Sequence, residues 1–261
     1  MATPNPAPMY QLQQIPGEGR GLIARRNMTR GQRILAESPL FTFPNIEDTM
    51  PIRQIIGPKV QALNGEQRRT FFGLFNNFRY FGTTGSIGTI KTNALRVDHE
   101  TDAVFPTFSL TNHSCLSNAS YSWDGNIMKG TLHTIRDISA GDEITIAYGD
   151  HRRGSAGRFV CLCPLCTTDN RAGLARSDRR REEMSILEEQ IWRWDGPPRE
   201  PEDVFRLCHD LQVLMLEEYS STPSPALAEV YEFAAGIAAA NSDAGRDCCA
   251  IKMGVFSEAY L

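Results

Sequence analysis

The chain has 261 residues, of which 22% are charged and 41% hydrophobic, and its formal net charge is −4. These proportions are close to those of average globular proteins and exclude wholesale disorder, a collagen-like fibre and a coiled coil. The charge balance gives no general basic surface, so direct binding to nucleic acid is not expected. The length favours one substantial domain with an appendage.

The sequence predicts an intracellular protein, in the nucleus or the cytoplasm, with no attachment to a membrane. No run of about 18 apolar residues occurs, and the first twenty residues lack the apolar core of a signal peptide. Residues 1–9 are rich in proline and predict a flexible N-terminus. Leu261 falls inside an amphipathic segment without a capping signal, so we expect the natural chain to run a little further.

Short strands are predicted at the start of the chain. Residues 10–43 alternate short apolar groups with glycine-bearing turns, one of which is Gly17-Glu18-Gly19-Arg20-Gly21. Residues 45–80 instead repeat apolar side chains at helix-like intervals and predict two helices. Residues 82–88 are rich in Gly, Thr and Ser and are expected to form a loop that ends this helical insertion.

Strand patterns return over residues 103–148, with turns at Asp124-Gly125 and at Ala140-Gly141-Asp142. After Cys166 the pattern is helical again and includes helices near residues 201–219 and 224–240. Because strands and helices are segregated in blocks, the sequence argues against a parallel βαβ sheet and favours an α+β fold. The Arg-rich run at residues 176–181 precedes two glutamates and favours a solvated helix face over a nuclear signal.

Seven cysteines are present, and their grouping carries the strongest signal in the composition. Cys161, Cys163 and Cys166 lie within six positions, whereas a structural zinc site needs four ligands. Cys115 is the only other cysteine outside the C-terminal helices, 46 residues before Cys161. The alternative is that these cysteines are small buried apolar residues, which is what we expect for the three in the helical tail, Cys208, Cys248 and Cys249.

Four motifs together resemble the SET domain of protein lysine methyltransferases. They are Gly17-Glu-Gly-Arg-Gly21, Asn112-His113-Ser114-Cys115, Gly141-Asp-Glu-Ile-Thr-Ile-Ala-Tyr148 and the cysteine triplet, and they follow the order of that family over roughly residues 10–166. Within the family the chain looks most like SMYD-type proteins. Their MYND zinc finger contains cysteines, and no cysteine precedes Cys115 here, so we expect the finger to be absent.

The resemblance implies an α+β fold of several short-stranded sheets with a threaded (pseudoknot) C-terminal segment, a helical insertion and a C-terminal helical subdomain. It implies a SET domain over residues 10–150, with the insertion at about 45–90, a post-SET zinc loop over 151–170 and the helical subdomain over 171–261. It also implies one structural zinc, bound by four cysteines: Cys115, Cys161, Cys163 and Cys166.

The resemblance further implies a methyl transfer from S-adenosylmethionine to a lysine of a protein substrate, histone or non-histone. Tyr148 matches the catalytic tyrosine beside the transferred methyl group. The expected cofactor-binding residues are Gly17, Glu18, Gly19, Arg20, Asn93, Asn112, His113, Tyr148 and Phe159, the last matching the aromatic residue that packs on the adenine.

One departure from the family pattern concerns the lysine channel. Several SET proteins have a tyrosine two residues before the aromatic residue that matches Phe159, where this chain has Gly157. Two alternatives to a protein methyltransferase therefore stay open. One is a binding module with a SET fold and no catalysis, and the other is a SET scaffold that acts on a small molecule.

Overall fold

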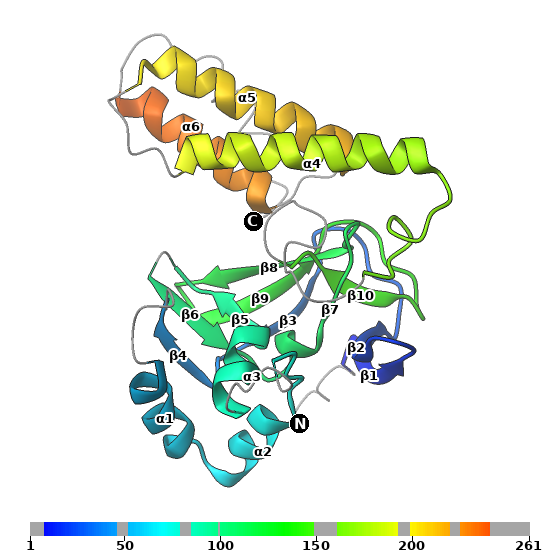
Figure 1. The fold of residues 1–261 in the computed structure, drawn as a ribbon, viewed down its shortest axis with the longest axis vertical. Helices are drawn as coiled ribbons and strands as arrows, with labels where there is room; N and C mark the ends of the chain where they lie inside the picture. Colours follow the sequence, from blue (N-terminus) through cyan, green and yellow to red (C-terminus); the bar gives the residue numbers. More distant parts are fainter. Residues whose placement is uncertain are drawn as a thin grey trace, which may run out of the picture. The chain divides into compact units, whose positions relative to one another are not determined.

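A computed structural model describes residues 8–45, 52–78, 85–98, 100–148, 161–192, 199–219 and 225–240 (Figure 1). The chain divides into two compact units. The first comprises Met1–Asn112 and Tyr121–Ile146, and the second comprises His113–Ser120 and Ala147–Leu261. Among the described residues, the first unit contains most of the strands and three α-helices, and the second contains three longer helices, so the predicted α+β class with several small sheets is confirmed. The threading of the C-terminal segment stays a prediction.

The first sheet brings together strands that are far apart in the sequence. Its order is β1 (Tyr10–Ile15), β2 (Gly19–Ala24), β10 (Glu143–Ile146) and β7 (Asn112–His113). β1 and β2 form a tight antiparallel hairpin, with Ile15 opposite Gly19. Gly17 and Gly19 both have a φ of +82°, a conformation that glycine adopts without steric cost. The first glycine motif is therefore the turn of a hairpin.

Two three-stranded sheets complete the first unit. One has the order β3 (Arg33–Glu37), β9 (Lys129–Thr134), β8 (Ala119–Asp124), and the other β4 (Phe41–Pro44), β6 (Thr101–Val104), β5 (Ala94–Arg96). The Glu37 carboxylate accepts hydrogen bonds from the backbone N–H groups of Thr107 and Phe108, both at 2.8 Å. These bonds satisfy the N-terminal donors of the short 3₁₀ helix η1 (Phe108–Leu110).

The described part of the helical insertion contains three helices rather than the two predicted: α1 (Ile52–Ala62), α2 (Gly65–Gly73) and α3 (Gly85–Asn93). The expected loop at residues 82–88 is therefore wrong from Gly85 onward. In Figure 1 the three helices lie together beside the sheet that contains β4. They form one core with that sheet, made of Phe43, Ile56, Val60, Leu63, Phe71, Leu74, Ile87, Ile90 and Val104.

The second unit contains α4 (Arg171–Trp192), α5 (Pro201–Glu218) and α6 (Pro225–Ala240), close to the predicted helical segments. α4 packs against α5, and α5 packs against α6. Their shared core includes Met184, Cys208, Leu211, Met215, Leu227 and Val230. Cys208 is 4% exposed, as expected for a structural cysteine, whereas Cys248 and Cys249 lie outside the described residues. None of the described helices is long and apolar enough to cross a membrane.

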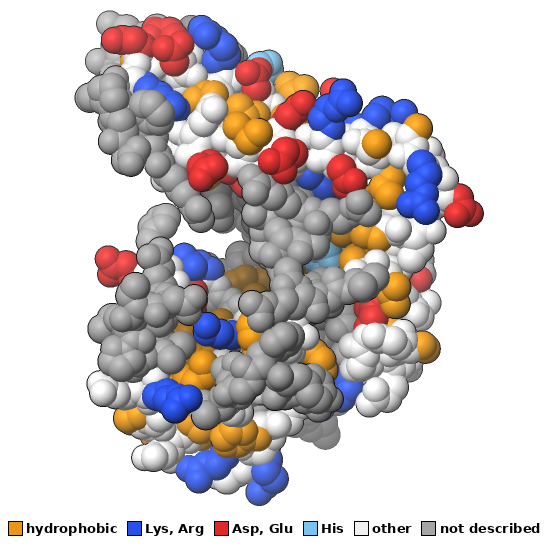
Figure 2. Space-filling model, in the orientation of Figure 1, with side chains coloured by type: hydrophobic (Ala, Val, Ile, Leu, Met, Phe, Trp, Pro, Cys, Tyr) orange, Lys and Arg blue, Asp and Glu red, His pale blue; other side chains and the backbone are white. Residues whose placement is uncertain are grey.

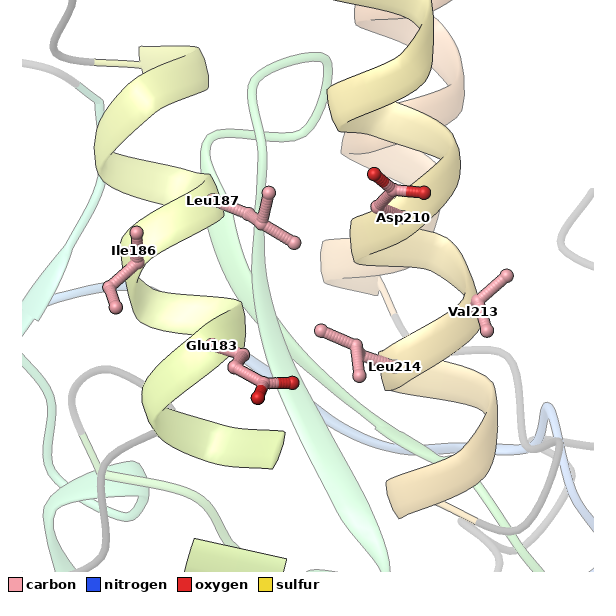
Figure 3. A pocket seen from close by; sticks show the side chains of 6 residues that line it. All are labelled: Glu183, Ile186, Leu187, Asp210, Val213 and Leu214. Atoms are coloured by element: carbon pink, nitrogen blue, oxygen red, sulfur yellow. The ribbon is translucent and has the colours of Figure 1, made fainter. Parts of the chain in front are cut away.

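The surface of the helical unit has an uneven distribution of charge. Figure 2 shows blue basic side chains over the N-terminal half of α4 and red acidic side chains over the rest of the helix. The arginines all precede Glu182, and no Lys or Arg follows Arg181 in α4. A groove of about 430 Å³ lies between α4 and α5, where Leu187 and Leu214 face each other between Glu183 and Asp210 (Figure 3).

Candidate functional site

The second unit contains a cluster of four cysteines. The Sγ atoms of Cys115, Cys161, Cys163 and Cys166 all lie within 4.8 Å of one another. The distances from the Cys115 sulfur to those of Cys161 and Cys166 are 3.9 and 3.5 Å. Four sulfurs at about 2.3 Å from a tetrahedral zinc would be about 3.8 Å apart. The donor set and its spacing therefore fit zinc.

A short turn holds the cysteine triplet in place. The backbone N–H groups of Cys166 and Thr167 donate to the Cys163 carbonyl oxygen, at 2.9 and 3.0 Å. Hydrogen bonding by the Cys115 thiol lowers the pKa of Cys163, whereas the same contact and burial raise the pKa of Cys115. One sulfur of the cluster is thus stabilised as a thiolate by its neighbours, and a metal cation would displace the remaining protons.

His113 connects this cluster to Tyr148. Its Nδ1 accepts a hydrogen bond from the Tyr148 backbone N–H at 2.9 Å, and the two ring centroids are 5.3 Å apart. Burial lowers the pKa of His113 and so favours the neutral ring. Because Nδ1 is an acceptor, the proton of the neutral ring is on Nε2, which lies 3.3 Å from the Cys115 sulfur. His113 therefore donates to Cys115 while it positions Tyr148.

Asn112 is the last residue of the first of the two segments that form the first unit, and it is held by a partner that its sequence context does not indicate. Its Nδ2 donates to the Glu143 carboxylate at 2.8 Å. Burial raises the pKa of Glu143, and the bond from Asn112 lowers it in part. A Cβ at Gly21 would lie 2.5 Å from the Glu143 Oε1 and 2.9 Å from the Asn112 Nδ2. Glycine at position 21 thus allows β2 to pass close to the Asn112–Glu143 pair. The sequence does not show this requirement, because it arises only when the strands lie side by side in the sheet.

The predicted glycine motif and Asn93 also lie in the first unit. Residues 16–20 are exposed, so the hairpin turn leaves its backbone accessible, while the Arg20 side chain donates to the Gly73 carbonyl at the end of α2. Asn93 is 7% exposed, and its Nδ2 donates to the carbonyl oxygens of Phe75 and Thr89, both at 2.7 Å. Asn93 therefore holds the end of α3, a structural role that its sequence context did not indicate. Phe159 and Gly157 lie outside the described residues.

Arg181 corrects one expectation from the sequence. The run at residues 176–181 was predicted to be a solvated helix face, yet Arg181 is 3% exposed and its Nη2 donates to the Cys115 carbonyl at 2.6 Å. The position of Arg181 along the helix could have indicated this burial. The buried residues of α4 recur at helical spacing, and Arg181 lies in that stripe with Leu174, Ser177, Met184, Ser185 and Ile191.

The comparisons with known proteins agree with this arrangement of motifs. The family model described as "SET domain" matches residues 19–149, which is half of the chain. The chain is 30% identical over 190 residues to the histone-lysine N-methyltransferase set5 of Schizosaccharomyces pombe, a match that covers 69% of this chain and 57% of that protein. The chain thus spans little more than half the length of this relative.

Two human relatives match shorter parts of the chain. The protein-lysine N-methyltransferase SMYD4 of Homo sapiens is 37% identical over 97 residues, covering 33% of this chain and 12% of that protein. The histone-lysine N-methyltransferase SMYD3 of Homo sapiens is 32% identical over 109 residues, covering 35% of this chain and 25% of that protein. Because the family model matches half of its length, the chain belongs to the SET domain family.

Proposed function

We propose that this protein transfers a methyl group from S-adenosylmethionine to a lysine amine of a protein substrate. Membership of the SET domain family supports the proposal, as do relatives whose names describe lysine methyltransferases. The observation that carries it is the contact between His113 and Tyr148, because a neutral histidine holds the tyrosine backbone at 2.9 Å in the motif that the family uses for catalysis.

When bound, S-adenosylmethionine supplies a methyl group that passes to the lysine nitrogen as the carbon–sulfur bond breaks and its electrons remain on sulfur. The protein must align the amine with that bond and exclude water. It must also favour the neutral amine, since deprotonating a free lysine at pH 7 costs about 4.6 kcal/mol. We assign to the Tyr148 hydroxyl the orientation of the amine and the methyl group. His113 fixes the backbone of Tyr148 for this role.

Binding of the cofactor is assigned to the exposed backbone of the hairpin turn at Gly17, Glu18, Gly19 and Arg20, and to Asn112 and His113. The open turn supports the first assignment, because glycine lets a ligand approach the backbone closely. The hydrogen bond to Glu143 supports the assignment to Asn112, since it orients the Asn112 amide. Asn93, Tyr148 and Phe159 complete the proposed set.

A structural zinc is proposed for the four cysteines. With four sulfurs around the ion, no coordination position remains open for a substrate, so the metal has a folding role. It would fix Cys115 to the triplet 46 to 51 residues later in the chain. Because Cys115 also accepts the His113 Nε2–H, the metal would stabilise the segment that contains His113.

The proposal is tested by separating cofactor binding from transfer with Tyr148→Phe, which removes one hydroxyl. We expect calorimetry to show an affinity for S-adenosylmethionine close to that of the unchanged protein, whereas the methyl-transfer rate falls by about 10²-fold because the amine is no longer aligned. Tyr231→Phe removes a hydroxyl from α6 and is the matched control, with transfer unchanged. Equal transfer by the Tyr148 and Tyr231 variants would contradict the role of Tyr148.

A further inference from the structure

Arg181 is a buried charge that links the tail helices to the cysteine cluster. Its side chain is 4% exposed and that of its partner Glu218, on α5, is 1% exposed. The Arg181 Nε donates to the Glu218 Oε1 at 2.7 Å and lies 3.3 Å from the Ser177 Oγ. The Nη2 group donates to the Cys115 carbonyl oxygen. One guanidinium thus connects α4, α5 and the segment that contains the first cysteine.

The Glu218 carboxylate of α5 binds two arginines of α4. Arg180 also binds Glu218, through Nε and Nη2 to Oε2 at 2.9 and 2.7 Å, so one carboxylate faces two guanidinium groups. Four thiolates around a divalent zinc carry a net charge of −2. When bound, the metal would thus give the cluster a negative charge, which favours the guanidinium that binds the Cys115 carbonyl oxygen.

The geometry gives Arg181 a second role that Arg180 does not share. Only Arg181 reaches a backbone atom of a cluster residue, whereas the Arg180 side chain is 26% exposed and both of its hydrogen bonds go to Glu218. A planar guanidinium can bridge two acceptors with fixed directions. Arg181 therefore fixes the carbonyl of Cys115, whose Sγ is held by the cluster and contacts the His113 Nε2.

We propose that Arg181, oriented by Glu218 and Ser177, is a positioning residue for the metal and cofactor sites, acting through Cys115. It makes the tail helices α4 and α5 part of the site, because the Cys115 peptide is correctly placed only when both helices are in position. The part of this inference that concerns the cofactor rests on the proposed function, and the part that concerns the metal does not.

The test compares Arg181→Gln with Arg180→Gln, since both remove one guanidinium from Glu218 but only the first removes the bond to Cys115. Zinc content, the rate of zinc loss to a chelator and the absorption spectrum of the cobalt-substituted protein are measured on the full chain. We expect Arg181→Gln to lose zinc about 10- to 100-fold faster and to alter the sulfur-to-cobalt bands. We expect Arg180→Gln to lower the melting temperature while the cobalt spectrum stays unchanged.

A conservative pair keeps the test decisive if Arg181→Gln does not fold. Arg181→Lys retains the charge, but a single ammonium group cannot replace the planar guanidinium, whose separate N–H groups bind both Glu218 and the Cys115 carbonyl. Zinc loss should therefore still be faster than in Arg180→Lys. The inference is overturned if the two positions give the same zinc-loss rates and cobalt spectra, or if the unchanged protein binds no zinc.

The affinity for S-adenosylmethionine gives the second readout. We expect Arg181→Gln to bind it about tenfold more weakly than Arg180→Gln, because His113 loses the support of Cys115. Equal affinities in the two variants would overturn the cofactor part of the inference. Absence of binding by the unchanged protein would instead overturn the proposed function, while zinc loss and the cobalt spectrum would still decide the metal part.

Discussion

Gly21 shows at the scale of one residue how the first sheet limits what the site can tolerate. The Cβ of an alanine there would lie within 3.0 Å of Glu143, Ile15 and Asn112. The Glu143–Asn112 pair would have to move. We expect Gly21→Ala to lower the free energy of unfolding by about 1 to 3 kcal/mol and to weaken cofactor binding, as measured by urea denaturation and calorimetry.

The matched control is Gly236→Ala in α6, where a Cβ would meet no atom within 4 Å. Alanine is favoured over glycine in a helix by about 1 kcal/mol, so this variant should be slightly more stable and should bind the cofactor normally. If Gly21→Ala proves as stable as Gly236→Ala, the close approach of β2 to the Asn112–Glu143 pair is not a constraint in solution.

Single residues also show which parts of the site the sequence can reveal. The four cysteines are recognisable because three are clustered and only one other precedes the tail helices. The partner of Asn112 cannot be recognised in the sequence, because Glu143 is 31 residues away. The two side chains meet only when β10 lies beside β2 in the sheet. Arg181 is hidden among neighbouring arginines, and its burial depends on Glu218, which is 37 residues later.

At the scale of elements, α2 depends on its N-terminal cap. The Asn64 Oδ1 accepts from the N–H groups of Glu66 and Gln67, and the Gln67 Oε1 accepts from the Asn64 N–H, which completes a capping box. We expect Asn64→Ala to cost about 1 kcal/mol of the free energy of unfolding, measured by urea denaturation. Asn64→Ser should restore most of the loss, whereas equal stability of the three proteins would show that the cap contributes nothing.

Elements were predictable where the pattern is local. The tail helices appear at residues 201–218 and 225–240, within one residue of the ends expected from apolar spacing. α3 was missed because Gly85, Gly88 and the Thr and Ser residues around them favour a loop. Glycine is needed at position 88 because of a tertiary contact, since a Cβ there would clash with the Asn76 side chain. The neighbouring Ile87 and Ile90 pack in the core with Phe71. Packing therefore overrides a weak helix propensity.

At the scale of the whole molecule, the chain enters the second unit twice, between Asn112 and His113 and between Ile146 and Ala147, and it returns to the first unit at Tyr121. Strands far apart in the sequence assemble around Asn112 in the first unit, and helices that follow residue 170 support Cys115 in the second. The proposed tail subdomain is then more than a packing unit, because one of its arginines contacts the segment that contains the predicted zinc ligand. We propose that a chain without these helices would lose zinc and cofactor together.

The most direct test of the account is the transfer of isotopically labelled methyl groups from S-adenosylmethionine. The full chain is incubated with total cell protein, and the products are digested and analysed by mass spectrometry, with Tyr148→Phe as the control. The account predicts labelled methyl groups on lysine side chains of protein, strongly reduced in the control. Label found only on small molecules, or cofactor binding without any labelled product, would contradict the proposed protein-lysine methyltransferase.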